Sequence, residues 1–285
     1  MHVGHQKIVN SLVEVGKQRG LESVVLTFFP HPRMVLQKDA NIKLINTIEE
    51  KESILKSLGL SRLVVNEFTK AFSRMTAEDF VEQILVNQLK AKHIIIGYDH
   101  HFGRNRNANI DDLKAFGKIY NFTVEEIPAQ DVDDVAVSST KIRTALQEGD
   151  VETANTFLNY NFMLTGKVVK GKGLGKTINY PTANIKINED YKLIPKNGVY
   201  IVKSTINGKD VYGMMNIGFN PTVNGQHKTI EVHFLNFKND LYESTLKVEL
   251  LKRIRNEIKF NTLSDLKAQI QLDQKFTQDF IADVK

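Results

Sequence analysis

Two histidines at the start of the chain have the spacing to bind one anion. His2 and His5 flank Gly4 and precede a segment of helical period at residues 6–19. Imidazole N–H groups three residues apart, beside the free backbone N–H groups of a helix N-terminus, can donate hydrogen bonds to a phosphate. Taken alone, these four residues favour an unstructured chain start, so the phosphate-binding interpretation depends on a second motif.

Three hydroxyls and an arginine mark the predicted start of a later helix. Ser138, Ser139 and Thr140 open a helical segment at residues 138–147, Arg143 lies one turn inside it, and Gly149 is typical of its end. Hydroxyls, free N–H groups and a guanidinium at one helix start suit a triphosphate. A simple helix cap is the alternative for this segment taken alone.

A glycine-rich loop and a short polar strand follow in the second half of the chain. Gly171, Gly173 and Gly175 alternate with other residues and permit close approach of a phosphate, while Lys172 and Lys176 supply positive charge. Just downstream, Thr182 and Asn184 alternate on a predicted strand, and neutral oxygens on one face suit Mg²⁺. The alternatives are a flexible hairpin for the loop and a buried polar pair for the strand.

One acidic residue stands on a strand predicted at residues 229–237. Glu231 and His233 share one face of it, and Ile230, Val232 and Phe234 share the other. An acid on a strand is ordinarily only a solvated side chain, and the strand by itself favours that interpretation.

The surrounding pattern predicts an α/β chain with two architectures. Between residues 23 and 127, short apolar runs alternate with segments of helical period, which indicates βαβ units and a parallel sheet. Beyond residue 162 the pattern changes to successive strands, with a hairpin signal at Asn207-Gly208 and a terminal helix at residues 263–281. We expect a domain of residues 1–155 and an antiparallel β-barrel domain of residues 156–285 with a terminal helix.

The motifs in combination resemble a known enzyme family. HxGH near the first helix and SSTxIR near the last are similar to the nucleotidyltransferase superfamily, whose Rossmann-like sheet binds ATP between them. TFFPHP at residues 27–32 and GYDHHFG at 97–103 resemble bacterial FAD synthetases, while GKGLGK followed by PTAN resembles riboflavin kinases. NIGFNPT at 216–222 and EVHFLNFKNDLY from Glu231 onward are also similar. The whole chain therefore resembles the bifunctional riboflavin kinase/FAD synthetases.

This resemblance implies two ATP-dependent reactions and their residues. In the barrel, riboflavin becomes FMN with Glu231, rather than His233, as the catalytic base. In the N-terminal domain, FMN becomes FAD with His2 and His5 as catalytic groups. Mg²⁺ is the implied metal, and ATP, riboflavin and FMN are the implied substrates. The implied Mg²⁺ ligands are Thr182 and Asn184, and the implied ATP-binding residues are Gly97, Asp99, Ser138, Ser139, Thr140, Arg143, Gly171, Lys172, Gly173, Gly175 and Lys176.

The sequence departs from the family pattern at its beginning. The family's fuller motif, GxFDGxHxGH, follows a first strand, whereas Met1 here stands directly before His2. We expect a gap in the parallel sheet, because a doubly wound sheet holds its first strand in the centre, and we expect Met1 to be internal to a longer natural chain. The alternative function is riboflavin kinase alone, with adenylyl transfer lost. Asn179, where many members have glycine, is a smaller departure.

Composition excludes several classes of protein and leaves one alternative. The 285 residues are 41% hydrophobic, and no apolar run approaches the roughly 20 residues of a membrane span. The absence of cysteine excludes disulfides and thiolate metal sites and fits the cytoplasm. Residues 1–159 carry 19 basic and 21 acidic side chains, whereas residues 160–285 carry 19 and 12. The basic second half leaves nucleic-acid binding as an alternative, although no aromatic residues accompany its basic run. Another HxGH adenylyl- or cytidylyltransferase is less consistent with PTAN, and the sequence indicates no oligomeric state.

Overall fold

The computed structural model describes residues 1–37, 41–97, 101–127, 137–171, 173–222 and 225–284, with only the backbone at 220–222 and 225–227. Two positions named above, Asp99 and Lys172, lie outside the described residues. The chain divides into two compact units. Unit 1 comprises Met1–Lys43 and Ile48–Val137, and unit 2 comprises Leu44–Thr47 and Ser138–Lys285.

Unit 1 alternates helices with short parallel strands, as its periodicity predicts. Its elements in chain order are α1 (Val3–Arg19), β1 (Val24–Phe29), α2 (Pro32–Leu36), α3 (Ile48–Ser57), β2 (Arg62–Glu67), η1 (Phe72–Arg74), α4 (Ala77–Asp79), η2 (Phe80–Gln88), β3 (His93–Gly97), η3 (Arg104–Arg106), α5 (Ile110–Tyr120) and β4 (Thr123–Ile127). The helix η2 is a π-helix that continues directly from α4.

The strands of unit 1 form two separate parallel pairs. β1 pairs with β2 from Val24↔Arg62 onward, and β3 pairs with β4 from His93↔Thr123 onward. Among the described residues these pairs are two-stranded sheets, each closed by a helical crossover, α3 or α5. The predicted parallel architecture is confirmed.

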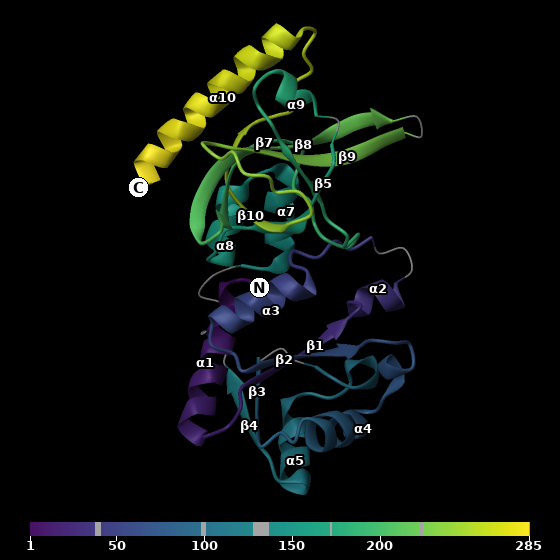
Figure 1. The fold of residues 1–285 in the computed structure, drawn as a ribbon. Coiled ribbons are helices and arrows are strands. Elements are labelled where there is room, and N and C mark those ends of the chain that lie inside the picture. The colour runs from purple at the N-terminus through teal and green to yellow at the C-terminus, as the bar shows by residue number, and fades with distance from the viewer. Residues whose placement is uncertain (38–40, 98–100, 128–136, 172, 223–224, 285) are drawn as a thin grey trace. The chain divides into compact units, whose positions relative to one another are not determined.

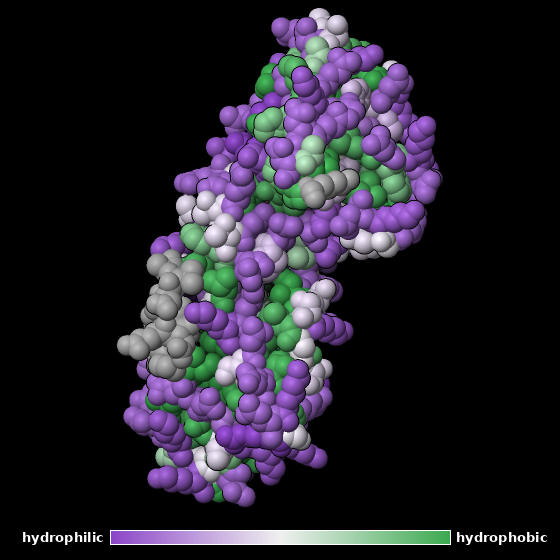
Figure 2. All heavy atoms as spheres, turned by 90° about the vertical axis from the view of Figure 1, so that its left-hand side faces the viewer, coloured by the Kyte–Doolittle hydropathy of each residue, from purple (hydrophilic) through white to green (hydrophobic). Residues whose placement is uncertain are grey.

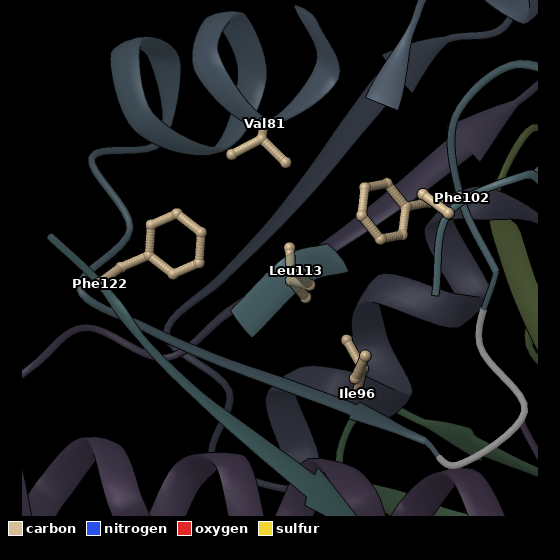
Figure 3. Packing of buried hydrophobic residues seen from close by; sticks show 6 residues of the cluster. Val81, Ile96, Phe102, Leu113 and Phe122 are labelled. Atoms are coloured by element: carbon tan, nitrogen blue, oxygen red, sulfur yellow. The ribbon is translucent and has the colours of Figure 1, made fainter. Parts of the chain in front are cut away.

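Each pair of strands has its own apolar core. Val9 and Val13 of α1 and Leu55 of α3 are buried together and pack against Val25 and Leu63 of β1 and β2. The second core surrounds β3 and β4, and Figure 3 shows its side chains converging from separate elements. Its buried members are Val81, Ile96, Phe102, Ala108, Leu113 and Phe122. The first of these cores holds α1 and α3, whose first turns carry polar residues discussed below.

Unit 2 places two helices before a six-stranded barrel, followed by a long terminal helix (Figure 1). Its elements are α7 (Ser139–Glu148), α8 (Val151–Leu158), β5 (Met163–Val169), α9 (Leu174–Thr177), β6 (Ala183–Lys186), β7 (Gly198–Ile206), β8 (Lys209–Thr222), β9 (Gly225–Phe234), β10 (Thr245–Arg255) and α10 (Leu263–Val284). The helix α7 ends at Gly149, whose φ of 87° is the left-handed conformation that glycine adopts without a steric penalty.

The strands of unit 2 form a closed barrel in the order β10-β5-β6-β9-β8-β7. All pairings are antiparallel, and β7 and β8 are joined at Asn207-Gly208, where both residues have positive φ as a two-residue hairpin turn requires. The predicted antiparallel barrel is therefore confirmed.

The terminal helix α10 packs on the barrel through an apolar patch and a buried ion pair. Ile270 and Ile281 lie against buried Val199 and Met214. Arg255 Nη2 lies 2.7 Å from Asp273 Oδ2, and only 4% of the Asp273 side chain is exposed. Because losing one partner would leave a buried charge, this pair fixes where α10 lies on β10.

Hydrophilic residues cover most of the surface seen in Figure 2. Within the described ranges, no helix combines the length and the hydropathy needed to cross a membrane.

Candidate active sites

Thr182 and Glu231 meet on the barrel of unit 2. Thr182 Oγ1 donates a hydrogen bond to Glu231 Oε2 at 3.2 Å, and both side chains are partly buried. Asn184 is the cross-strand partner of Glu231 between β6 and β9. Residues directly opposite in an antiparallel ladder point to the same face of the sheet. The structure therefore brings together the three residues that the sequence placed at this site.

Asn216 extends the same row by one strand. It pairs with Glu231 between β8 and β9, so Asn184, Glu231 and Asn216 lie side by side on one face. The neighbouring positions Met215 and Val232 are buried in the core. The sequence placed Asn216 in a family motif without a role, since its position beside Glu231 follows only from the strand order.

The glycine loop lies against this row. A Cβ atom at Gly171 would come within 2.2 Å of Asn184 Nδ2, so only glycine fits there without displacing the asparagine. A Cβ atom at Gly175 would come within 2.2 Å of the carbonyl oxygen of Tyr180. Gly173 is different, because it has open space around it and a φ of 73° at the start of α9. Asn179 also has a positive φ, 66°, a conformation that asparagine tolerates better than most residues, so it can replace the family's glycine.

Three contacts hold the end of this loop. Tyr180 Oη donates to Gln274 Oε1 of α10 at 2.9 Å, and the Tyr180 and His233 rings meet edge to face at 5.1 Å. His233 Nδ1 lies 2.8 Å from the carbonyl oxygen of Pro181. His233 thus contacts the loop, whereas Glu231 contacts the PTAN threonine. Lys176 lies exposed within α9.

The oxygens of this site fit a hard divalent cation. The hydroxyl of Thr182, the side-chain carbonyl of Asn184 and the carboxylate of Glu231 are the oxygen ligands that Mg²⁺ prefers. Mg²⁺ keeps several waters or phosphate oxygens as ligands, so a few protein oxygens beside an open glycine loop suffice. The arrangement can therefore hold a metal–phosphate group next to a carboxylate.

In unit 1, the two N-terminal histidines lie together at the start of α1. His2 is the N-cap residue without a side-chain capping bond, and its ring centroid is 3.9 Å from that of His5. His2 Nδ1 is buried and has no hydrogen-bond partner among the residues that the structure describes. Desolvation, His2, the terminal amino group and Lys51 all lower the pKa of His5, although His5 as a whole residue is exposed. Both histidines are therefore neutral at pH 7, each with one N–H donor.

A lysine that the motifs did not include lies close to this pair. Lys51, in the first turn of α3, donates to Thr27 Oγ1 of β1 at 2.9 Å. Its positive charge contributes to the lowered pKa of His5. A signal was available in the sequence, because Lys51 falls on the helix face of Ile54 and Leu55, where an apolar residue is the ordinary choice.

The other predicted nucleotide-binding residues lie at element ends. Gly97 is the last residue of β3, at the carboxyl end where ligands of parallel sheets bind. Ser138 is the N-cap of α7 and its Oγ accepts from the backbone N–H of Lys141 at 3.2 Å. Ser139 and Thr140 open α7, with Arg143 in the following turn. These α7 residues belong to unit 2, whereas His2 and His5 belong to unit 1.

These features define a two-part enzyme of nucleotidyltransferase and kinase type. One part has parallel βαβ pairs with an HxGH motif at a helix start, and the other is a barrel with a glycine loop and a polar Thr-Asn-Glu site. Comparison with family models is specific on both parts. Residues 1–141 match the FAD synthetase family, and residues 158–281 match the riboflavin kinase family.

Curated relatives match nearly the whole chain. The bifunctional riboflavin kinase/FMN adenylyltransferase of Listeria monocytogenes is 37% identical over 284 residues, covering 99% of this chain and 90% of the relative. The protein of the same name from Bacillus subtilis is 36% identical, with 96% and 87% coverage. The one from Escherichia coli K12 is 34% identical, with 98% and 89% coverage. The chain belongs to the bifunctional riboflavin kinase/FMN adenylyltransferase family.

A solved structure has the same fold. It is entitled a macrolide-efflux protein from Streptococcus pneumoniae, is 31% identical, and superimposes with a TM-score of 0.86 over 97% of this chain and 90% of that one. Its title names an efflux protein, whereas both family models and the curated relatives name the two flavin activities. The family assignment rests on the family models and the curated relatives.

Proposed function

We propose that this chain converts riboflavin to FMN and then FMN to FAD, consuming ATP in each step. Residues 156–285 would act as the riboflavin kinase and residues 1–155 as the FMN adenylyltransferase. The observation that carries the proposal is the meeting of Thr182, Asn184 and Glu231 on one barrel face beside the glycine loop. The two family matches support the assignment of both activities.

In the kinase reaction, Glu231 is the general base. Its carboxylate accepts the proton of the terminal ribityl hydroxyl as that oxygen attacks the γ-phosphorus of ATP, and ADP leaves. The backbone at Gly171, Gly173 and Gly175, with Lys172 and Lys176, holds the phosphates of ATP. Tyr180 and His233 position the loop through the contacts described above. Glu231 is close enough to Thr182 to be oriented by its hydroxyl.

Thr182 and Asn184 would hold Mg²⁺ in this site through their hydroxyl and amide oxygens. The bound cation supplies neutralisation of charge on the phosphate oxygens. The protein's own contribution is to keep both oxygens on one face of β6 and its preceding residue, opposite Glu231.

In the adenylyl transfer, the nucleophile is a phosphate oxygen of FMN. It attacks the α-phosphorus of ATP and pyrophosphate leaves, so the protein needs no covalent intermediate. His2 and His5 donate hydrogen bonds from neutral imidazoles to the reacting phosphates, and Ser138–Thr140 and Arg143 hold the triphosphate. Gly97, at the end of β3, would contact ATP, and the family resemblance implies the same role for Asp99. Catalysis is positioning and charge stabilisation.

No observation favours a kinase acting alone, because the FAD synthetase family model matches residues 1–141. We place the enzyme in the cytoplasm, because ATP supplies both reactions and a chain with no cysteine needs no oxidising compartment. Its partners would be the small molecules ATP, riboflavin and FMN rather than nucleic acid or a membrane.

Isotope position tests the proposal. With riboflavin, Mg²⁺ and [γ-³²P]ATP, we expect the label in FMN and FAD. With [α-³²P]ATP, we expect it in FAD only, because adenylyl transfer moves the α-phosphorus and the kinase does not. Label in neither flavin would overturn the proposal, and label from the γ-position in FMN without any FAD would overturn its adenylyltransferase half.

A further inference from the structure

Lys51 lies in surroundings that disfavour a positive charge. It stands in the first turn of α3, whose dipole favours the acidic residues found beside it, Glu49 and Glu50. Its ammonium donates to the neutral hydroxyl of Thr27, and among the described residues no carboxylate pairs with it. Desolvation lowers the pKa of Lys51, and no paired carboxylate among the described residues offsets it.

The next lysine of the same helix shows the contrast. The Lys56 side chain is 69% exposed and pairs with Glu52 one turn away, at 2.8 Å. Lys56 therefore has water and a carboxylate as partners, whereas the partly buried Lys51 has one hydroxyl as its hydrogen-bond partner among the described residues. A partly desolvated cation without a counter-charge is unfavourable for folding, so its partner is expected to be a ligand.

The groups around Lys51 offer N–H donors to that ligand. His5 lies near enough for the two groups to interact electrostatically, and His5 is stacked on His2. Within the described ranges, His2 Nδ1 is buried without a partner. In Figure 1 the N-terminus lies beside α3, in agreement with this interaction. One ammonium, two imidazoles and the first N–H groups of α1 make a cluster that recognises a multiply charged anion.

We propose that Lys51 binds the reacting phosphates of the adenylyltransferase site, with His2 and His5, and stabilises the charge that develops on the departing pyrophosphate. The inference rests on the proposed function of residues 1–155. The alternative is that Lys51 only braces α3 against β1 through Thr27.

Activity and stability separate these alternatives. We expect Lys51→Met to lower adenylyl transfer from ATP to FMN by roughly 10- to 100-fold, the loss typical of one charged hydrogen bond. The rate of riboflavin phosphorylation should not change, and the unfolding midpoint should stay equal or rise, because a partly buried charge without a carboxylate partner is removed. Lys56→Met is the matched control and should change neither rate. If Lys51 only holds α3 against β1, Lys51→Met should lower the unfolding midpoint. Thr27→Val should then reduce adenylyl transfer as strongly as Lys51→Met.

A binding measurement tests the inference without catalysis. Inorganic pyrophosphate is titrated into the full chain while the imidazole NMR signals of His2 and His5 are followed, assigned with His2→Asn and His5→Asn. We expect both signals to shift, with half-saturation roughly 10-fold or more higher in Lys51→Met and in Lys51→Gln. Unshifted signals in the wild-type chain, or equal half-saturation in all variants, would overturn the inference. Shifts that depend on Lys51 in a chain that makes no FAD would keep it and overturn the proposed function instead.

Discussion

Replacing Glu231 by glutamine removes the proposed base while changing the structure little. Glutamine has the same shape, and its side-chain oxygen can still accept the hydrogen bond from Thr182 that is 3.2 Å long in the native chain. The cross-strand neighbours Asn184 and Asn216 are uncharged, so no ion pair is lost. We therefore expect the unfolding free energy to fall by only about 1 kcal/mol, the difference between a charged and a neutral hydrogen bond.

The rate should change far more. A positioned general base contributes about 10²- to 10⁴-fold, which corresponds to roughly 2.7–5.5 kcal/mol of activation free energy. We expect kcat for FMN formation to fall by that factor in Glu231→Gln while KM for riboflavin stays within about threefold of the wild-type value. The assay is initial-rate chromatography of FMN at saturating ATP and Mg²⁺, with thermal unfolding of each variant measured in parallel.

The matched control is Glu243→Gln, which also removes one carboxylate from the barrel unit. Glu243 is 72% exposed and pairs with Lys167, so its loss should leave kcat unchanged. An unchanged kcat with a raised KM in Glu231→Gln would refute the reasoning and make Glu231 a substrate-positioning residue. An equal loss of kcat in both variants would mean that the changed net charge of the barrel unit, and not the loss of a general base, lowers the rate.

Three further predictions concern the loop, the terminal helix and the histidine pair. Gly171→Ala should lower the kinase rate by roughly 10-fold or more, because the added methyl group would displace the PTAN asparagine. Gly173→Asn should retain most of the kinase rate, because this position has open space and a φ that asparagine tolerates. Kinase rates at several Mg²⁺ concentrations measure both variants. Asp273→Ala should lower the unfolding free energy by about 3 kcal/mol, because it leaves Arg255 without its ion-pair partner. Lys167→Met, at an exposed ion pair, should lower it by less than about 1 kcal/mol. Urea denaturation measures both losses, and equal losses would contradict the assigned role of the buried pair. The pKa of His5 is lower in the folded than in the unfolded chain, so the unfolded chain takes up the proton first and the unfolding free energy should fall as pH drops below about 6.5. His5→Asn should weaken this pH dependence in thermal unfolding at pH 5–8. An unchanged dependence of the midpoint on pH would contradict the lowered pKa.

Much of the fold follows from local sequence patterns. The strands β1 and β3 are continuous apolar runs, and α7 begins at a serine cap and ends at Gly149 as predicted. The barrel strands and α10 were visible from alternation and helical spacing. In these segments the periodicity, the turn residues and the tertiary environment all favour the same structure.

Short helices were not predictable in the same way. The helix α8 follows Gly149 after one residue, and α9 is four residues long, beginning after Gly173 and containing Gly175. Neither is long enough for hydrophobic spacing to identify it. The helix α1 begins at Val3, three residues before the predicted start, with His2 as its N-cap and Gly4 buried in its first turn.

The site residues likewise differ in whether local sequence patterns could identify them. Thr182 and Asn184 could be selected because motif and strand alternation agree, whereas Glu231 was selected on the family resemblance alone. Asn216 joins them only through the order of β6, β9 and β8, and Tyr180 meets Gln274 across 94 positions of sequence. Such contacts depend on tertiary packing, which a single sequence does not reveal.

The most direct measurement is a crystal structure of the chain with riboflavin, Mg²⁺ and a non-hydrolysable ATP analogue. We predict that Mg²⁺ contacts the oxygens of Thr182 and Asn184, and that the terminal ribityl hydroxyl lies within hydrogen-bond distance of Glu231 and in line with the γ-phosphorus. Riboflavin bound elsewhere, or a cation coordinated away from the PTAN segment with Glu231 facing solvent, would contradict the assignment of the kinase site.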